Sequence, residues 1–93
     1  MDYRSKQWKT LRRGVLRRDG YLCRECRRYG RSREACTVHH ILPAREYPQY
    51  ALCGWNLISL CSRCHDAMHD RTTDALTDRG RFWAERTVPP PSD

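Results

Sequence analysis

The segment CSRCHDAMH, residues 61–69, has two cysteines separated by two residues, followed by two histidines separated by three. Two residues between cysteines allow a tight turn to direct both thiolates at one tetrahedral zinc ion. The pattern predicts a helix over residues 62–71, and positions four apart on a helix share one face. The segment therefore predicts half of a zinc site that leads directly into a pair of metal-binding histidines, His65 and His69.

A second C-x-x-C pair, Cys23 and Cys26, completes the four ligands of a structural zinc site together with Cys61 and Cys64. Residues 27–60 between the two pairs must then form a folded insert. A zinc site of this kind can contribute on the order of 10 kcal/mol to folding. That contribution offsets the small core that a chain of 93 residues can bury.

The other interpretations of the six cysteines are disulfides and redox chemistry. Three disulfides are disfavoured because no secretory signal precedes them, and we expect a cytoplasmic protein in which thiols stay reduced. A thioredoxin-type pair is disfavoured because there are two pairs and no βαβ pattern. Cys36 and Cys53 have no partner pair, and the sequence predicts no role for them.

The remaining two histidines, His39 and His40, are adjacent in TVHHIL, which predicts a strand over residues 37–42. Neighbouring strand residues point to opposite sides, so the two are not expected to be equivalent ligands of one ion. A division is more natural, in which one histidine binds metal and the other stays free. A free imidazole can take a proton from water near neutral pH. The alternative is that both are ordinary core or surface histidines.

Residues 5–18 predict an amphipathic helix with a basic outer face. Trp8, Leu11 and Val15 recur at helical spacing, Ser5 can cap the first turn, and an Asp-Gly pair ends the helix. The later segments are short, and Gly80 could break the last of them. We expect an extended piece over 21–26, an irregular loop over 44–54, an apolar strand over 55–60, a final helix capped by Thr73 or Asp74, and a disordered proline-rich tail over 88–93.

The charge balance is 18 Lys and Arg against 11 Asp and Glu, a net charge of +7. A surplus of this size favours polyanionic partners, and the planar fork of arginine suits phosphate oxygens. The alternative is that the charge serves only solubility. The candidate contacts to a DNA backbone are Arg12, Arg13, Arg17, Arg18, Arg24, Arg27 and Arg28, with Arg45 and Arg63 placed near the histidines.

Three segments of the chain resemble a known family. VHHILP (38–43), NLISLC (56–61) and CHDAMH (64–69) resemble the H-N-H signature of the HNH endonucleases, the ββα-metal or His-Me finger nucleases, with His40, Asn56 in the second segment and His65 at the signature positions. The four cysteines and the preceding arginine-rich helix resemble the small phage and prophage members of that family. The resemblance covers nearly the whole chain apart from the tail.

The resemblance implies a role for each matching residue. His40 corresponds to the general base, and Asn56 to the residue that braces the loop between the strands and holds that base. His39, His65 and His69 correspond to the ligands of a catalytic divalent ion. Relatives often have Asp at the position of His39. Three imidazoles suit Zn²⁺, Ni²⁺ or Mn²⁺ better than Mg²⁺, although similar enzymes often use Mg²⁺ or Mn²⁺.

Together these patterns predict an α+β protein with a zinc-stapled ββα-metal core. The expected function is metal-dependent hydrolysis of DNA, by nicking or double-strand cutting. We expect the protein to be a monomer or weak homodimer that does not contact a membrane. The phage-type relatives imply DNA packaging beside terminase or portal proteins. The alternative is a non-catalytic zinc module that binds nucleic acid, which would not explain the histidines. We expect one nuclease domain over 1–87, made of a basic helix (1–20), the core (21–71) and a last helix (72–87), followed by the tail (88–93).

Overall fold

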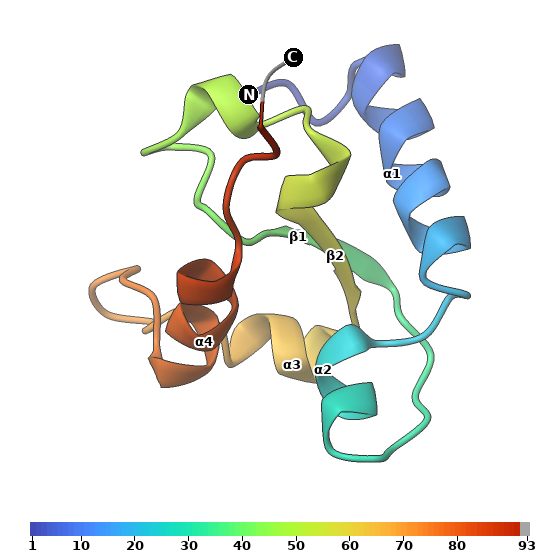
Figure 1. The fold of residues 1–93 in the computed structure, drawn as a ribbon, viewed down its shortest axis with the longest axis vertical. Coiled ribbons are helices and arrows are strands. Elements are labelled where there is room, and N and C mark those ends of the chain that lie inside the picture. The colour runs from blue at the N-terminus through green and yellow to red at the C-terminus, as the bar shows by residue number, and fades with distance from the viewer. Residues whose placement is uncertain (92–93) are drawn as a thin grey trace.

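The computed structural model describes residues 1–91, and its centre is a two-stranded antiparallel sheet (Figure 1). In that sheet His39 pairs with Ile58, and His40 with Leu57. Helix α1 runs along one side of the sheet, whereas α2 and α3 lie together at one end of it. The elements are α1 (Lys6–Arg18), α2 (Arg24–Arg28), β1 (Thr37–His40), β2 (Leu57–Leu60), α3 (Ser62–Asp66) and α4 (Asp78–Arg86), with 3₁₀ turns at Pro48–Tyr50 and Gly54–Asn56. The expected ββα core, with a helix before it and a helix after it, is confirmed.

Helix α1 begins and ends as the sequence predicts. The Ser5 hydroxyl oxygen accepts a hydrogen bond from the Trp8 backbone N–H at 3.1 Å. The helix ends at the buried Asp19, whose carboxylate accepts hydrogen bonds from the backbone N–H of Ser59 and from Arg18. Burial raises the pKa of the Asp19 carboxyl, but the hydrogen bonds lower it by more, so the pKa lies below its usual value. The end of α1 is thereby fixed to the middle of β2.

Strand β2 is buried on both faces and separates two apolar clusters. On one face Leu57 packs with the buried side of α1. On the other face Ile58 and Leu60 pack with four cysteines, with Met68 and with the edge of α4. Alternation along a strand explains this division, because residues 58 and 60 share a face that residue 57 does not.

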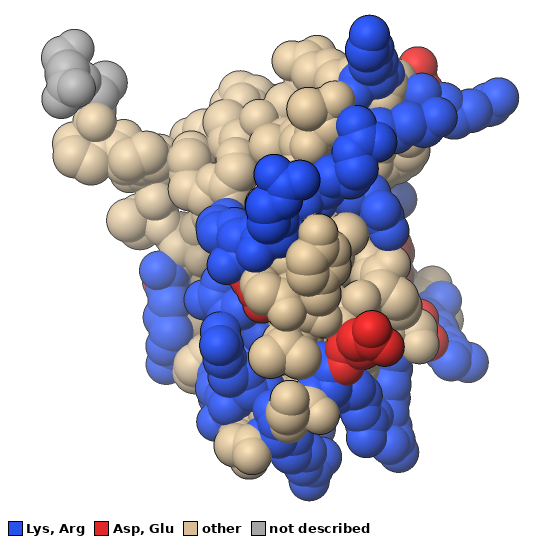
Figure 2. All heavy atoms as spheres, turned by 90° about the vertical axis from the view of Figure 1, so that its right-hand side faces the viewer, with Lys and Arg blue, Asp and Glu red and all other residues tan. Residues whose placement is uncertain are grey.

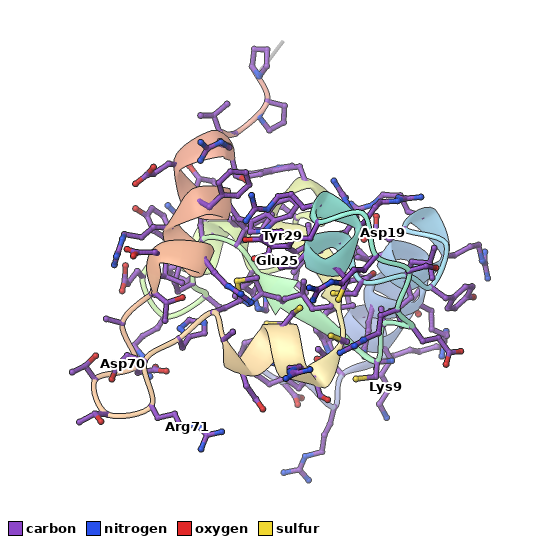
Figure 3. All side chains as sticks on the ribbon, turned by 90° about the horizontal axis from the view of Figure 1, so that it is seen from below. Lys9, Asp19, Glu25, Tyr29, Asp70 and Arg71 are labelled. Atoms are coloured by element: carbon purple, nitrogen blue, oxygen red, sulfur yellow. The ribbon has the colours of Figure 1, made fainter. Side chains whose placement is uncertain are left out.

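Helix α4 is joined to α2 by the buried Glu25, which lies between the two helices (Figure 3). Arg28 donates to the Glu25 carboxylate at 2.7 Å, and the Trp83 indole N–H donates to the same oxygen at 3.3 Å. The Arg28 guanidinium also lies over the Phe82 ring, 3.6 Å from its centroid. These contacts hold α4 in place, so that its residues Trp83 and Ala84 pack against the cluster that contains the four cysteines.

Two strand boundaries differ from the prediction. Strand β1 ends at His40 because beyond it the Asn56 side chain, instead of a neighbouring strand, pairs with the backbone of Leu42. Strand β2 begins at Leu57 because the residues before it form a 3₁₀ turn. The extended piece expected over 21–26 is also wrong, since α2 begins at Arg24 with the preceding cysteine as its N-cap.

The predicted helix over 62–71 is wrong in length, because α3 ends at Asp66. The Thr77 hydroxyl donates to the Ala67 carbonyl at 2.6 Å, and its backbone N–H donates to the Met68 carbonyl at 2.9 Å. These carbonyls are therefore not available to continue the helix, and the chain forms a loop over 67–77 that is closed by the bridge between His69 and Leu76. The same Thr77 caps α4 through the Gly80 N–H, in place of the predicted Thr73 or Asp74.

No helix within residues 1–91 is both long and apolar enough to cross a membrane. Residues 87–91 have no regular secondary structure, and the rest of the predicted disordered tail lies outside the described residues.

Gly80 does not break α4, because its missing side chain allows a close approach. A Cβ at this position would lie 2.5 Å from the Met68 carbonyl oxygen and 2.8 Å from Leu76 Cδ2. We expect Gly80→Ala to lower the free energy of unfolding by about 1–3 kcal/mol, since the neighbouring backbone must shift. Denaturant unfolding measures this.

The matched control for that substitution is Gly14→Ala. Gly14 lies within α1, and a Cβ added there would meet no neighbouring group within 4 Å. This variant should gain up to about 1 kcal/mol from helix propensity. Equal effects of the two substitutions would contradict the close approach at Gly80.

Candidate metal centres and catalytic cleft

The four predicted zinc ligands come together in the structure. The sulfur atoms of Cys23, Cys26, Cys61 and Cys64 all lie within 4.8 Å of one another, and all four residues are buried. Cys26 Sγ lies 3.6 Å from Cys64 Sγ and 3.9 Å from Cys61 Sγ. All six cysteines of the chain lie in the described residues, and all are free thiols. The cluster could therefore hold a metal ion.

The chemistry of this cluster fits a dication. Burial raises the pKa of the Cys26 and Cys64 thiols. Burial also opposes the ionisation of Cys61, but hydrogen bonds from the Cys64 backbone N–H and the neighbouring thiols lower its pKa to about 7. One thiolate thus forms readily, whereas several crowded thiolates need a cation to neutralise them.

The four histidines line one cleft of about 640 Å³. The ring centroids of His39 and His65 are 5.6 Å apart, and those of His39 and His69 are 5.5 Å apart. In the described residues only the cysteines have three or more ligand atoms within 4.8 Å of one another. The three imidazoles are therefore neighbours, but their nitrogen atoms are not gathered as closely as the four sulfurs.

His39 carries the feature that best fits a metal ligand. Its side chain is 2% exposed, and its buried Nε2 has no hydrogen-bond partner among the described residues. Burial, with the neighbouring His65 and His69, lowers the pKa of His39 to about 3. The imidazole is thus neutral and has a lone pair for an ion, and a buried nitrogen in a polar cluster needs such a partner.

His69 is held by a turn and not by a helix. It lies beyond the end of α3, where it pairs with Leu76 in an isolated bridge. Its Nδ1 lies 3.2 Å from the Asp74 carbonyl oxygen, which can only accept a hydrogen bond, so Nδ1 carries a hydrogen and Nε2 is the nitrogen left to meet a metal. Asp70 and Arg71 follow in a turn that protrudes beside α3 (Figure 3). The prediction that His65 and His69 share a helix face is wrong, because only His65 lies on α3, although both rings lie beside the His39 ring.

His40 faces other groups than His39 does, as strand alternation predicts. Its Nε2 lies 2.9 Å from the Ala51 carbonyl oxygen, which can only accept a hydrogen bond. Nε2 therefore carries the hydrogen, and Nδ1 has the lone pair of a base. Burial lowers the pKa of His40 more than this hydrogen bond raises it, so the ring is neutral near pH 7. The ring also stacks on Trp8.

Asn56 controls the loop that supplies the partner of His40. Its buried side chain donates to the carbonyls of Leu42 at 3.0 Å and Tyr50 at 3.3 Å, and accepts from the Leu42 N–H at 2.8 Å. It thus joins the start of the loop between the strands to its end. Ala51 directly follows Tyr50 in the chain. The hydrogen bond from Asn56 to Tyr50 therefore helps to position the Ala51 carbonyl, which is the hydrogen-bond partner of His40.

The candidate arginines fall into three groups. The first is engaged within the protein: Arg18 donates to Asp19 and to the carbonyls of Gly54 and Leu57, Arg24 bonds Asp19, and Arg28 bonds Glu25. The second lines the cleft, where Arg12 donates to the Cys36 carbonyl and Arg45 pairs with Asp74. The third, Arg13, Arg17, Arg27 and Arg63, is exposed. Lysine and arginine side chains gather on the face that carries α1 (Figure 2).

Three groups at the site could not be identified from the sequence. Two are the backbone carbonyls of Ala51 and Asp74, which have no side-chain signature. The third is Trp8, whose spacing predicts only a place on the buried face of a helix. Its contact with His40 depends on how that helix docks on the sheet.

Comparison with known proteins agrees with this geometry. The family model for HNH endonucleases matches residues 23–71. The crystal structure of the HNH endonuclease of the deep-sea thermophilic bacteriophage GVE2 with manganese ion is similar to the chain, with 38% sequence identity and a TM-score of 0.67. The match covers 69% of this chain and 70% of that chain. A search of curated proteins finds no match. The chain belongs to the HNH endonuclease family.

Removal of the metal from the cysteine cluster should unfold the protein. We expect Cys26→Ser to lose bound zinc and most of the folding stability, because such a site contributes on the order of 10 kcal/mol. Metal analysis together with thermal unfolding measures both effects. The control is Cys36→Ser, which changes an exposed cysteine outside the cluster and should leave both unchanged. A stably folded, zinc-free Cys26→Ser protein would contradict the assignment.

Proposed function

We propose that the protein is a metal-dependent endonuclease that hydrolyses phosphodiester bonds in DNA. The observation that carries this proposal is a neutral His40 with a free Nδ1, held in the same cleft as three neighbouring imidazoles. A base and a metal site that share one cleft suit the activation of water beside a bound phosphate. Membership of the HNH endonuclease family supports the same reaction.

We further propose which residues hold each metal. The four buried sulfurs provide the ligand set that zinc prefers in structural sites. His39, His65 and His69 would hold the catalytic ion, which could be Mn²⁺, Mg²⁺, Zn²⁺ or Ni²⁺. The GVE2 enzyme was crystallised with manganese. When bound, this ion supplies electrostatic stabilisation of the phosphate charge that grows in the transition state.

The chain's own residues then perform the proton transfer. His40 Nδ1 takes a proton from water as the water oxygen attacks phosphorus, and the bond from phosphorus to the 3′ oxygen breaks. The products are a 5′ phosphate and a 3′ hydroxyl, which takes up a proton from solvent. The Ala51 carbonyl keeps its hydrogen bond to Nε2 throughout, so it stabilises the imidazolium that forms. Asn56 acts by holding the loop in place.

The proposed DNA contacts lie around α1 and the cleft. Arg13, Arg17 and Arg27 are exposed and available to backbone phosphates, as is Arg63 on α3. Arg12 and Arg45 line the cleft itself and could reach a phosphate near the histidines. Arg18, Arg24 and Arg28 act first as structural residues through the contacts described above.

The biological setting is proposed from the family relationship alone. Similarity to a phage enzyme is in keeping with a role in phage DNA packaging beside terminase or portal proteins. The assembly we propose is a monomer or weak homodimer, since one active site cuts one strand. The chemistry in the cleft does not depend on either proposal.

The decisive experiment is cleavage of supercoiled plasmid by the protein loaded with Mn²⁺, Mg²⁺, Ni²⁺ or Zn²⁺. We expect His40→Ala to reduce the cleavage rate about 10²–10⁴-fold, because the general base is lost, with zinc content unchanged. The control Glu46→Gln changes an exposed carboxylate in the loop between the strands and should cleave at the parental rate.

Two results would overturn parts of this proposal. If His40→Ala cleaves as fast as the parent, His40 is not the base. If the parent cleaves no DNA with any of these ions but binds it, the chain is a non-catalytic zinc module for nucleic acid.

The arginines of α1 are tested through salt dependence. Removal of two phosphate contacts in the double variant Arg13→Gln, Arg17→Gln should reduce the slope of log affinity against log salt by about 2. Fluorescence anisotropy with duplex DNA in Ca²⁺, which is expected to allow binding without cleavage, measures the slope. The control is Arg18→Gln, which removes the hydrogen bonds to Gly54 and Leu57. It should lower stability and leave the slope unchanged, and the reverse pattern would contradict the assignment.

A further inference from the structure

Helix α1 forms a wall of the cleft although it lies outside the residues that the family model matches. That match begins at residue 23, whereas α1 ends at Arg18. Trp8 and Arg12 of this helix nevertheless line the same cleft as the four histidines. Figure 1 shows α1 along the side of the sheet. The cleft is therefore completed by a part of the chain outside the family core.

The contact between Trp8 and His40 has a defined geometry. The ring centroids are 5.3 Å apart, and the planes are nearly parallel at 17°. Both side chains are buried, with Trp8 5% and His40 9% exposed. Tyr3 lies edge-on against both rings, with centroids 5.4 Å from Trp8 and 6.2 Å from His40.

A single hydrogen bond would leave the imidazole incompletely fixed. Rotation about the second side-chain torsion of histidine is broad and nearly two-fold, and a half-turn exchanges Nε2 with Cε1 and Nδ1 with Cδ2. The Ala51 carbonyl selects one of the two flipped rings, because only Nε2 can donate to it, and the stacked indole restrains the tilt of the ring plane. Together they leave one orientation, in which Nε2 points to Ala51 and Nδ1 stays free.

We propose that Trp8 is a positioning residue for His40, and that its indole face holds the imidazole in the orientation that keeps Nδ1 free to act as the base. This inference rests on the proposed function of His40. The role proposed for Trp8 is exerted through His40, and no binding of substrate is assigned to it. Loss of the stack should slow the chemical step without weakening DNA binding, because the basic face of α1 is unchanged.

Trp8 also belongs to an apolar cluster with Val15, Leu16, Val38 and Leu57, so activity loss alone would not prove positioning. The matched control is therefore Leu16→Ala, which removes a buried side chain of the same helix and cluster. Both variants should lose stability. Only the Trp8 variants should lose cleavage rate when all are measured well below their unfolding midpoints.

The kinetic test is single-turnover cleavage at saturating duplex DNA, with the DNA dissociation constant measured separately in Ca²⁺. We expect Trp8→Leu to cleave about 10–100-fold more slowly with unchanged affinity. Trp8→Phe keeps a smaller aromatic face and should lose about three-fold. If Trp8→Leu does not fold, the cleavage rate of Trp8→Phe is compared with that of a Leu16→Val variant of similar stability. A Trp8→Phe rate equal to that of Leu16→Val would then overturn the proposal.

A second readout does not require activity. Nitrogen-15 NMR of the histidine side chains should show one tautomer for His40 in the parent, with hydrogen on Nε2. In Trp8→Leu it should show a mixture of the two tautomers, and in Leu16→Ala a single one. If the parent cleaves DNA and folded Trp8→Leu keeps both the parental rate and a single tautomer, positioning by Trp8 is wrong. If the parent does not cleave DNA, the proposed function fails instead.

Discussion

Four sulfur atoms within 4.8 Å of one another are the constraint on which the rest of the structure depends. They join α2 to the first turn of α3 at one end of a sheet of two short strands. Neither apolar cluster is large, and the cysteines themselves make up half of the one that includes Met68. Because α3 begins at the cluster, the position of His65 follows from where the sulfurs meet.

The elements that follow from local chemistry could be predicted from the sequence. Ser5 before an apolar stripe predicts the start of α1, and paired C-x-x-C motifs predict one cluster of sulfurs. The boundaries that could not be predicted are those at which a distant side chain captures a backbone group. Asn56 ends β1 by bonding Leu42, and Thr77 ends α3 by taking two carbonyls.

The same limit applies to the candidate site. The residue types and their order predict which histidines gather, and the cleft brings all four together. The tautomers of His40 and His69 depend on the carbonyls of Ala51 and Asp74. Any residue can supply a carbonyl, so the sequence contains no sign of these partners. His65 and His69 both lie beside His39, as the predicted metal site requires, although His69 is not on the predicted helix.

Helix α1 has one face of exposed cations and one face that packs against the sheet and His40. An evolving lineage cannot easily alter these two faces separately. A change in the docking of this helix would move the exposed cations and the imidazole together. If the proposed function holds, affinity for DNA and the rate of cleavage would both depend on this one helix, and exchange of the segment between relatives would transfer both at once.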